Sequence, residues 1–151
     1  MARAPVQVLV LPFRRAETLR YAVFSRRDDL TWQGIAGGGE GIETPLQAAR
    51  REAWEEGGIT ADCEFVTLQA RASVPVSCFP DTGHWGDELY VIPEHAFGVD
   101  LTGRDVVLSS EHDLVRWAPY AEALALLHYD SNRTALWELN RRLLGQGPRD
   151  A

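Results

Sequence analysis

Residues 37–59 read GGGEGIETPLQAARREAWEEGGI, a glycine-rich run that leads into a helix-like segment and closes on two further glycines. Thr44 supplies an N-cap side chain, Pro45 suits the first helical position, and Gln47 stands three residues after the cap, as in a capping box. Gly57–Gly58 provides a helix stop. The stretch therefore predicts a loop followed by a short capped helix.

The predicted helix carries an apolar stripe and an acidic face side by side. At about 100° per residue, Glu52, Glu55 and Glu56 fall on one arc that adjoins Ala49 and Ala53. Like charges at this spacing cost about 0.2–0.5 kcal/mol per pair, and acidic groups at a helix C-terminus cost about 0.3–1 kcal/mol each. Both effects reverse if the carboxylates hold Mg²⁺, which prefers oxygen ligands. The residues alone leave two interpretations, a magnesium site and a solvated polar face.

Strand and helix patterns flank this segment on both sides. Residues 6–11, ending at Pro12, and residues 21–25 predict two strands of a hairpin. Residues 32–43 contain five glycines and predict a strand that runs into a loop. Further along, the patterns predict strands over 65–72, 89–92 and 114–117, a loop over 79–86, and helices over 120–127 and 133–144, the last capped by Asp130 or Ser131. Strands that alternate with helices predict an α/β sandwich.

The length and the charge limit the classes of function. A chain of 151 residues has the usual size of one domain, so we expect a single domain over residues 1–151. The 15 basic and 22 acidic residues give a net charge of −7, which disfavours nucleic acid as a partner. A small polyphosphate meets the same repulsion, so its binding requires a cation or a few well-placed arginines.

The cysteines and the N-terminal segment indicate a cytoplasmic protein. Cys63 and Cys78 are too far apart for a metal knuckle and too few for a disulfide scaffold, and we interpret them as reduced thiols. The first apolar run is too short for a signal peptide or a membrane span. We therefore expect no membrane partner.

The spacing within residues 37–59 resembles the Nudix signature. Gly37 is followed by five residues and Glu43, and then by seven residues and the run REAWEEGGI at Arg51–Ile59. Every fixed position of the signature is met, with Ala53 in place of the commoner larger aliphatic. The resemblance implies a Mg²⁺-dependent pyrophosphohydrolase, with Mn²⁺ as a substitute ion, built as an α/β/α sandwich with a mixed β-sheet between helices.

The same resemblance implies roles for individual residues. Glu52, Glu55 and Glu56 would bind the catalytic Mg²⁺, with the backbone carbonyl of Gly37 as a further ligand. Arg51 would hold the glutamates in register.

Two further glutamates receive roles from the resemblance. Glu43 would form hydrogen bonds within the loop and the helix start. Glu111 would supply an extra metal ligand or the general base, and Glu52 is the alternative base. A surface acid next to a strand is the structural interpretation of Glu111.

Four motifs outside the signature resemble the bacterial dihydroneopterin triphosphate pyrophosphohydrolase branch: Trp32–Gln33, Leu108–His112, Arg116–Trp117 and Asp130–Arg133. This resemblance implies hydrolysis of dihydroneopterin triphosphate to the monophosphate and pyrophosphate, a step of folate biosynthesis.

The branch motifs and their neighbours provide candidate substrate-binding residues. One of the neighbours Arg26 and Arg27, here assigned as Arg27, would face the phosphates while the other covers the surface, and Trp32 would stack on a flat heterocycle. Asn132 and Arg133, at the start of the last predicted helix, would bind an anion or a ligand edge. Core packing for the tryptophan and solvated surface positions for the other three are the structural interpretations.

Alternatives remain for the substrate and for the class of protein. Pro75 stands about where ADP-ribose-cleaving relatives often carry a proline, so an ADP-ribose, nucleoside diphosphate sugar or nucleoside triphosphate pyrophosphatase is the nearest alternative. A non-catalytic nucleotide-binding module is the other, although such domains usually lack part of the glutamate set. The sequence leaves a monomer and a homodimer equally open.

Overall fold

The structure is a computed structural model of the 151-residue chain, and it describes residues 2–26, 30–110, 112 and 114–149. This part of the chain forms three α-helices and seven strands. In chain order they are β1 (Arg3–Arg15), β2 (Leu19–Ser25), β3 (Trp32–Gln33), β4 (Ile35–Glu40), α1 (Pro45–Gly57), β5 (Phe65–Pro75), β6 (Val91–Asp100), β7 (Leu114–Ala118), α2 (Tyr120–Leu126) and α3 (Asp130–Leu143), with short 3-10 helices η1 (Val76–Cys78) and η2 (Gly83–Trp85) between β5 and β6.

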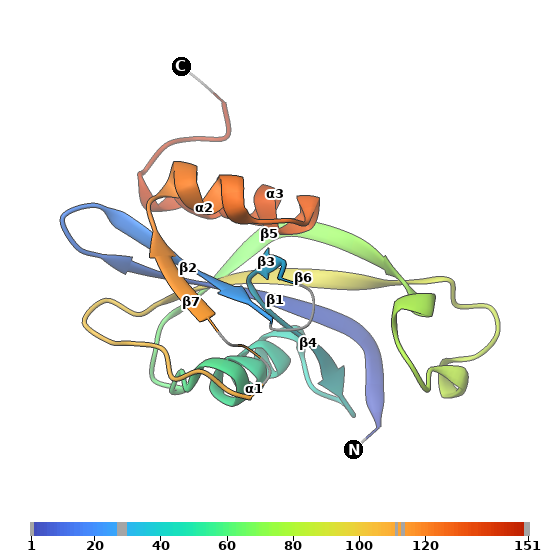
Figure 1. The fold of residues 1–151 in the computed structure, drawn as a ribbon. Helices are drawn as coiled ribbons and strands as arrows, with labels where there is room; N and C mark the ends of the chain where they lie inside the picture. The colour runs from blue at the N-terminus through green and yellow to red at the C-terminus, as the bar shows by residue number, and fades with distance from the viewer. Residues whose placement is uncertain (1, 27–29, 111, 113, 150–151) are drawn as a thin grey trace.

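The strands form a mixed sheet between helices (Figure 1). β1 runs parallel to β6 on one side and pairs antiparallel with β4 and then β2 on the other. β5 pairs with β6, and β2 also pairs with β3 and β7, all antiparallel. Helix α1 covers one face of the sheet, and α2 and α3 cover the opposite face (Figure 1). The predicted α/β/α sandwich is confirmed. No helix in the described ranges is long and apolar enough to cross a membrane.

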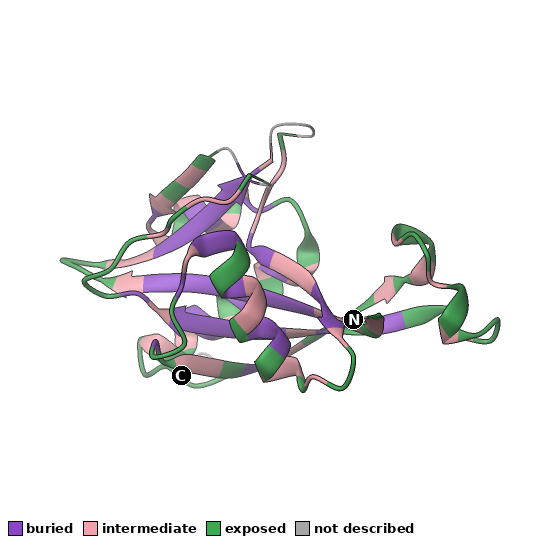
Figure 2. Ribbon diagram, turned by 90° about the horizontal axis from the view of Figure 1, so that it is seen from below, coloured by how far each residue is buried: buried purple, intermediate pink, exposed green. Residues whose placement is uncertain are grey.

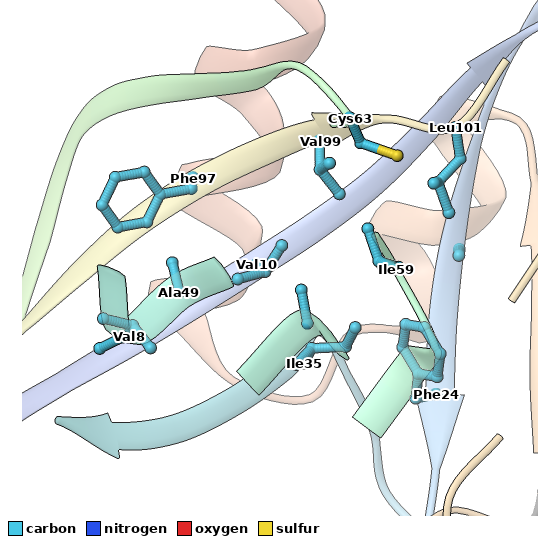
Figure 3. Close-up of a cluster of buried hydrophobic side chains, with 13 residues drawn as sticks. Val8, Val10, Phe24, Ile35, Ala49, Ile59, Cys63, Phe97, Val99 and Leu101 are labelled. Atoms are coloured by element: carbon cyan, nitrogen blue, oxygen red, sulfur yellow. The ribbon is translucent and has the colours of Figure 1, made fainter. Parts of the chain in front are cut away.

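Each face of the sheet carries a buried apolar layer (Figure 2). Val8 and Val10 of β1 point toward α1, where Ile35, Phe97 and Ala49 complete the layer (Figure 3). Leu9 and Leu11, which alternate with them along β1, belong to the layer under α2 and α3. Because side chains alternate between the faces of a strand, β1 is buried on both sides and forms the centre of the fold.

Helix α1 has the local structure that its sequence predicts. The Thr44 hydroxyl accepts a hydrogen bond from the Gln47 backbone N–H at 3.2 Å, and the Gln47 side chain accepts one from the Thr44 N–H at 2.9 Å. Pro45 occupies the first turn, and Gly58 ends the helix with φ 63°, a conformation that favours glycine. The boundaries of the acidic face are therefore fixed by its own sequence.

Two strands near the N-terminus depart from the prediction. β1 continues through Pro12 instead of ending there. Pro12 lies between Val10, paired with β4, and Phe13, paired with β2, so its missing N–H falls where the antiparallel partner changes. The glycine-rich residues 35–40 form the regular strand β4 rather than a loop. Glycine is needed there because other side chains approach its backbone closely.

Strand β6 and helix α3 are longer than predicted. β6 contains ten residues, with Pro93 near its start, before pairing with β1 begins at Glu94. α3 begins at Asp130, and Tyr129 occupies the N-cap position with no side-chain cap hydrogen bond within the described residues. The prediction that Asp130 or Ser131 caps a helix starting at residue 133 is wrong, because the helix starts a turn earlier.

Candidate active site

The acidic face of α1 forms one wall of a cavity of about 670 Å³. Glu52, Glu55 and Glu56 all line it. They differ in exposure: Glu56 is buried at 4% exposure, the Glu52 side chain is 12% exposed, and the Glu55 side chain is 51% exposed. The three carboxylates therefore lie along one helix face, with solvent exposure increasing from Glu56 at the core edge to Glu55.

Arg51 organises this acidic wall. Its Nη1 donates to Glu52 Oε1 at 3.0 Å and to Glu55 Oε2 at 3.2 Å. Its Nε and Nη2 donate to the two carboxylate oxygens of Glu43 at 2.9 and 3.0 Å, and Nη2 also donates to the Gly38 carbonyl at 2.6 Å. These bonds raise the pKa of Arg51 further above its usual range, with Glu43 contributing most. Arg51 thus ties the helix to β4 and to the turn before the helix.

Glu43 is the structural partner of Arg51. The Glu43 carboxylate also accepts a hydrogen bond from the Glu40 backbone N–H at 2.8 Å. The hydrogen bonds from Arg51 hold the pKa of Glu43 below its usual range. This arrangement matches the loop-and-helix role that the family resemblance implies for Glu43.

The glycines of β4 leave room for side chains to pack against the backbone of this strand. A Cβ on Gly37 would lie 2.0 Å from Cδ of Glu52, so the carboxylate packs directly against the strand's backbone. A Cβ on Gly38 would lie 2.5 Å from Cζ of Arg3. Both glycines line the cavity. The backbone at Gly37 and the Glu52 carboxylate can therefore face the same ligand.

The donor set fits a hard divalent cation. Carboxylates of Glu52, Glu55 and Glu56 and the backbone at Gly37 are oxygen donors of the kind that Mg²⁺ takes. Among the described residues, no three acidic, histidine or cysteine side chains converge at metal-binding geometry, since Arg51 draws Glu52 and Glu55 toward itself.

The segment before β7 closes over the C-terminal end of α1. The Val107 N–H donates to the Gly57 carbonyl at 2.8 Å, and the Ser109 N–H donates to the Glu56 carbonyl at 3.3 Å. Ser109 and Ser110 line the cavity, and Nε2 of the buried His112 lies 3.6 Å from Oε2 of Glu56. Glu111 itself lies outside the described residues, and its role as metal ligand or base stays a prediction.

A second wall of the cavity is cationic and aromatic. Arg3 and Arg26 line it together with Phe79 and Tyr129. The Arg3 guanidinium lies 4.4 Å from the centre of the Phe79 ring and donates from Nη2 to Gln7 Oε1 at 2.7 Å. Burial lowers the pKa of Arg3, and the nearby charge of Glu52 opposes that shift. Positive groups therefore line the same cavity as the carboxylates.

Three of the predicted substrate-binding residues, Trp32, Asn132 and Arg133, do not line this cavity. Arg27 lies outside the described residues, whereas its neighbour Arg26 lines the cavity. Trp32 is partly buried against the layer under α2 and α3, and its carbonyl accepts a hydrogen bond from the His128 N–H. Its neighbour Gln33 lines the cavity instead. Stacking of Trp32 on a heterocycle stays a prediction.

The earlier start of α3 determines where its two candidate residues point. Asn132 is buried, and its Oδ1 accepts a hydrogen bond from the Gly34 N–H at 2.8 Å. Arg133 donates from Nη1 to the Leu124 carbonyl at 2.8 Å and lines a separate depression beside Trp137. Asn132 therefore supports the start of β4, and Arg133 joins α3 to α2.

The sequence analysis missed several residues that line the cavity. Arg3, Gln7, Phe79 and Tyr129 come from segments that no motif marks, and in the Trp32–Gln33 motif it is Gln33 that lines the cavity. An isolated arginine at the start of a predicted strand gives no local signal of a site. Only the folded chain brings these residues to the same cavity.

Comparisons with known proteins agree with this description. A family model described as the NUDIX domain matches residues 4–139. Dihydroneopterin triphosphate diphosphatase of Escherichia coli strain K12 is 31% identical over 137 residues, covering 89% of this chain and 91% of that protein. A solved structure from Listeria monocytogenes, assigned as a NUDIX hydrolase, has a TM-score of 0.86 and 41% identity, covering 94% of this chain and 96% of that chain. The structure of E. coli dihydroneopterin triphosphate pyrophosphohydrolase has a TM-score of 0.73 and 28% identity, covering 93% and 99%.

Proposed function

This chain belongs to the Nudix family and is a hydrolase acting on phosphoanhydride bonds, and from that premise we propose that it is a Mg²⁺-dependent pyrophosphohydrolase of a small polyphosphate. The proposed substrate is dihydroneopterin triphosphate. Water cleaves it to dihydroneopterin monophosphate and pyrophosphate. The strands between Arg3 and Ala118 join one sheet, which supports a single domain over residues 1–151.

One observation carries the proposal: three carboxylates of α1 and two arginines line the same cavity of about 670 Å³. This volume falls in the range of about 300–1,000 Å³ that holds small ligands. Carboxylates alone would repel a triphosphate, and arginines alone would not hold a divalent cation. Both groups together suit a polyphosphate bound with its metal ion.

Each wall has a distinct part in the proposed chemistry. Glu52, Glu55, Glu56 and the Gly37 carbonyl would hold Mg²⁺, which neutralises charge on phosphate oxygens and makes water more acidic. Arg51 keeps Glu52 and Glu55 in position through the bonds described above.

Attack on phosphorus requires that a carboxylate take a proton from water. We propose Glu52 or Glu111 as this base. Glu52 lies beside the backbone of Gly37. Glu111 stands in the sequence next to Ser110, which lines the cavity, and His112, which contacts Glu56. Arginines on the cationic wall compensate the charge of the departing pyrophosphate.

The choice of a pterin triphosphate rests on the 31% identical relative of that activity and on the chemistry of the cavity. Gln7 and Gln33 bring side-chain amides, which offer both donors and acceptors to a heterocycle edge, and Tyr129 brings an aromatic ring. Pro75, the residue that raised the ADP-ribose alternative, ends β5 and is exposed. ADP-ribose and nucleoside triphosphates remain the competing substrates.

A substrate panel tests the proposal. Pyrophosphate and phosphate release would be followed with Mg²⁺ from dihydroneopterin triphosphate, ADP-ribose, diadenosine polyphosphates and nucleoside triphosphates. A dominant kcat/KM for dihydroneopterin triphosphate supports the narrow proposal. A dominant kcat/KM for ADP-ribose supports the metal-binding role of the α1 carboxylates and rejects the pterin substrate. Binding without turnover across the panel favours the nucleotide-binding module.

A further inference from the structure

We propose that Arg3 binds the polyphosphate of the substrate and that Phe79 and Gln7 hold its guanidinium in place for this purpose. The inference rests on the proposed function in one respect, that the ligand is a polyphosphate. Arg3 precedes the stretch matched by the family model.

The position of Arg3 is fixed from three directions. The Phe79 ring covers its guanidinium at 4.4 Å, the Gln7 side chain accepts from Nη2 at 2.7 Å, and the backbone of Gly38 lies so close that a Cβ there would be 2.5 Å from Cζ. The Arg3 carbonyl accepts a hydrogen bond from Trp85 Nε1 at 2.8 Å. An arginine held this firmly loses little entropy when it binds a ligand.

The guanidinium of Arg3 keeps its charge available, unlike those of Arg51 and Arg104. Arg51 bonds to Glu43, Glu52 and Glu55, and Arg104 bonds to Asp62 at 2.7 Å. The recorded partners of the Arg3 side chain are a neutral amide and an aromatic face, and within the described residues its Nε makes no hydrogen bond. A partly buried cation with spare donors favours an anion, and its planar fork suits phosphate.

The surroundings of Arg3 identify which anion fits. Arg3 lines the same cavity as the three carboxylates of α1, and the charge of Glu52 acts on it. A small carboxylate ligand would be repelled by that acidic wall. A polyphosphate that shares a divalent cation with the carboxylates reaches both walls, so pyrophosphate is the simplest probe.

The segment that holds Arg3 lies between β5 and β6 and extends from the rest of the fold (Figure 1, green to yellow). Its residues are largely exposed or half-buried (Figure 2). Phe79, His84 and Trp85 of this segment all contact Arg3. The contacts also suit a purely structural role, in which Arg3 anchors the segment, and the test must separate the two roles.

The test uses the full chain with Arg3→Gln, Arg3→Lys and the control Arg14→Gln. Arg14 also lies on β1 and covers an aromatic ring, that of Trp117 at 4.0 Å, but it does not line the cavity. Binding of inorganic pyrophosphate with Mg²⁺ would be measured by calorimetry, alongside kcat, KM and Tm. We expect Arg3→Gln to weaken pyrophosphate binding and raise KM by about 10- to 50-fold, as loss of a charge-assisted bond implies. Arg14→Gln should stay within about twofold of the wild type, the scale of a surface substitution.

Arg3→Lys keeps the test decisive if Arg3→Gln folds poorly. Lysine retains the positive charge, and its backbone carbonyl can still accept from Trp85, but it lacks the planar guanidinium. We therefore expect pyrophosphate affinity to fall by about 3- to 10-fold, with Tm near that of the wild type. Pyrophosphate affinity within about twofold of wild type in Arg3→Lys and in any folded Arg3→Gln would overturn the proposal. Equal losses in the Arg3 and Arg14 variants would overturn it as well.

Failure of this inference is distinguishable from failure of the proposed function. If the panel selects another polyphosphate substrate, the KM of that substrate should still rise in Arg3→Gln. If the wild type hydrolyses none of the panel, the proposed function fails, while pyrophosphate binding still reports on Arg3.

Discussion

The acidic and cationic walls of the cavity are built in opposite ways. The acidic wall lies on one helix, and Arg51 ties Glu52 and Glu55 to it from within the same helix. In the cationic wall, Arg3 of β1 meets Phe79, which follows β5, across more than half of the chain. The residues of the acidic wall lie within one short sequence motif. Those of the cationic wall come together only after the sheet has formed.

The largest effect should follow a change in the acidic wall. We expect Glu56→Gln to lower kcat by about 10³-fold or more, because losing a metal-binding carboxylate removes several kcal/mol of charge stabilisation. Glu56 is buried, and glutamine keeps its shape, so the circular dichroism spectrum should be unchanged. Glu17→Gln, at an exposed hairpin position, is the control. A Glu56→Gln enzyme with most of its activity would remove Glu56 from the catalytic set.

A smaller effect should follow a change in the residue that organises the wall. Lysine at position 51 cannot form the two parallel hydrogen bonds to Glu43 and cannot reach every other partner of Arg51. We therefore expect Arg51→Lys to lower kcat by about 10- to 100-fold. We expect it to lower the free energy of unfolding by about 1–3 kcal/mol. The measurements are steady-state kinetics and urea unfolding. Arg50→Lys, on the exposed side of the same helix, should change neither quantity appreciably. Similar results for the two variants would contradict the role of Arg51.

The bond between Arg51 and Glu43 should also appear in the pH dependence of stability. The pKa of Glu43 is lowered mainly by the hydrogen bonds from Arg51, so its contribution is complete above the unfolded value of about 4.3. The contribution is lost as the pH falls through the lower folded pKa. We therefore expect wild type to be more stable than Glu43→Gln at pH 7, with the difference shrinking under strongly acidic conditions. A difference independent of pH would show that charge plays no part.

The smallest effect should come from the outer support of the cationic wall. Trp85→Phe removes the donor to the Arg3 carbonyl at 2.8 Å, and we expect KM to rise about two- to tenfold with kcat unchanged, as for one neutral hydrogen bond. Trp137→Phe, a more exposed tryptophan on α3, controls for loss of an indole. A fall in kcat alone for Trp85→Phe would place this segment with the chemistry rather than with binding.

Local signals explain which parts of the fold the sequence predicts. The capping box at Thr44 and Gln47 and the positive φ at Gly58 act within a few residues, and both are found as predicted. Strand β6 was underestimated because its neighbours β1 and β5, rather than its own pattern, extend it through Pro93 and beyond. The start of α3 was misplaced because Tyr129 offers no capping side chain.

In the candidate site, too, the sequence predicts what depends on local spacing and misses what depends on contacts far along the chain. The family motif brings Glu52, Glu55 and Glu56 to one cavity wall, as their helical spacing predicts. Arg133 was chosen for its place near a helix start, yet it bonds to the Leu124 carbonyl in another part of the molecule. No sequence pattern marked Arg3 as a site residue, because its contacts come from Phe79 and Trp85 far along the chain.

The most direct test of the two-wall account compares Gly37→Ala with Gly38→Ala. Neighbouring methyl groups on β4 would collide with different partners, with Glu52 at 2.0 Å in the first variant and with Arg3 at 2.5 Å in the second. We expect Gly37→Ala to lower kcat by about 10²-fold, the scale of an ångström misplacement at the chemistry. For Gly38→Ala we expect KM to rise by about tenfold with kcat little changed, since one interaction of a charged group is weakened. If both variants lower kcat and leave KM unchanged, the cavity has no separate binding wall and the account is wrong.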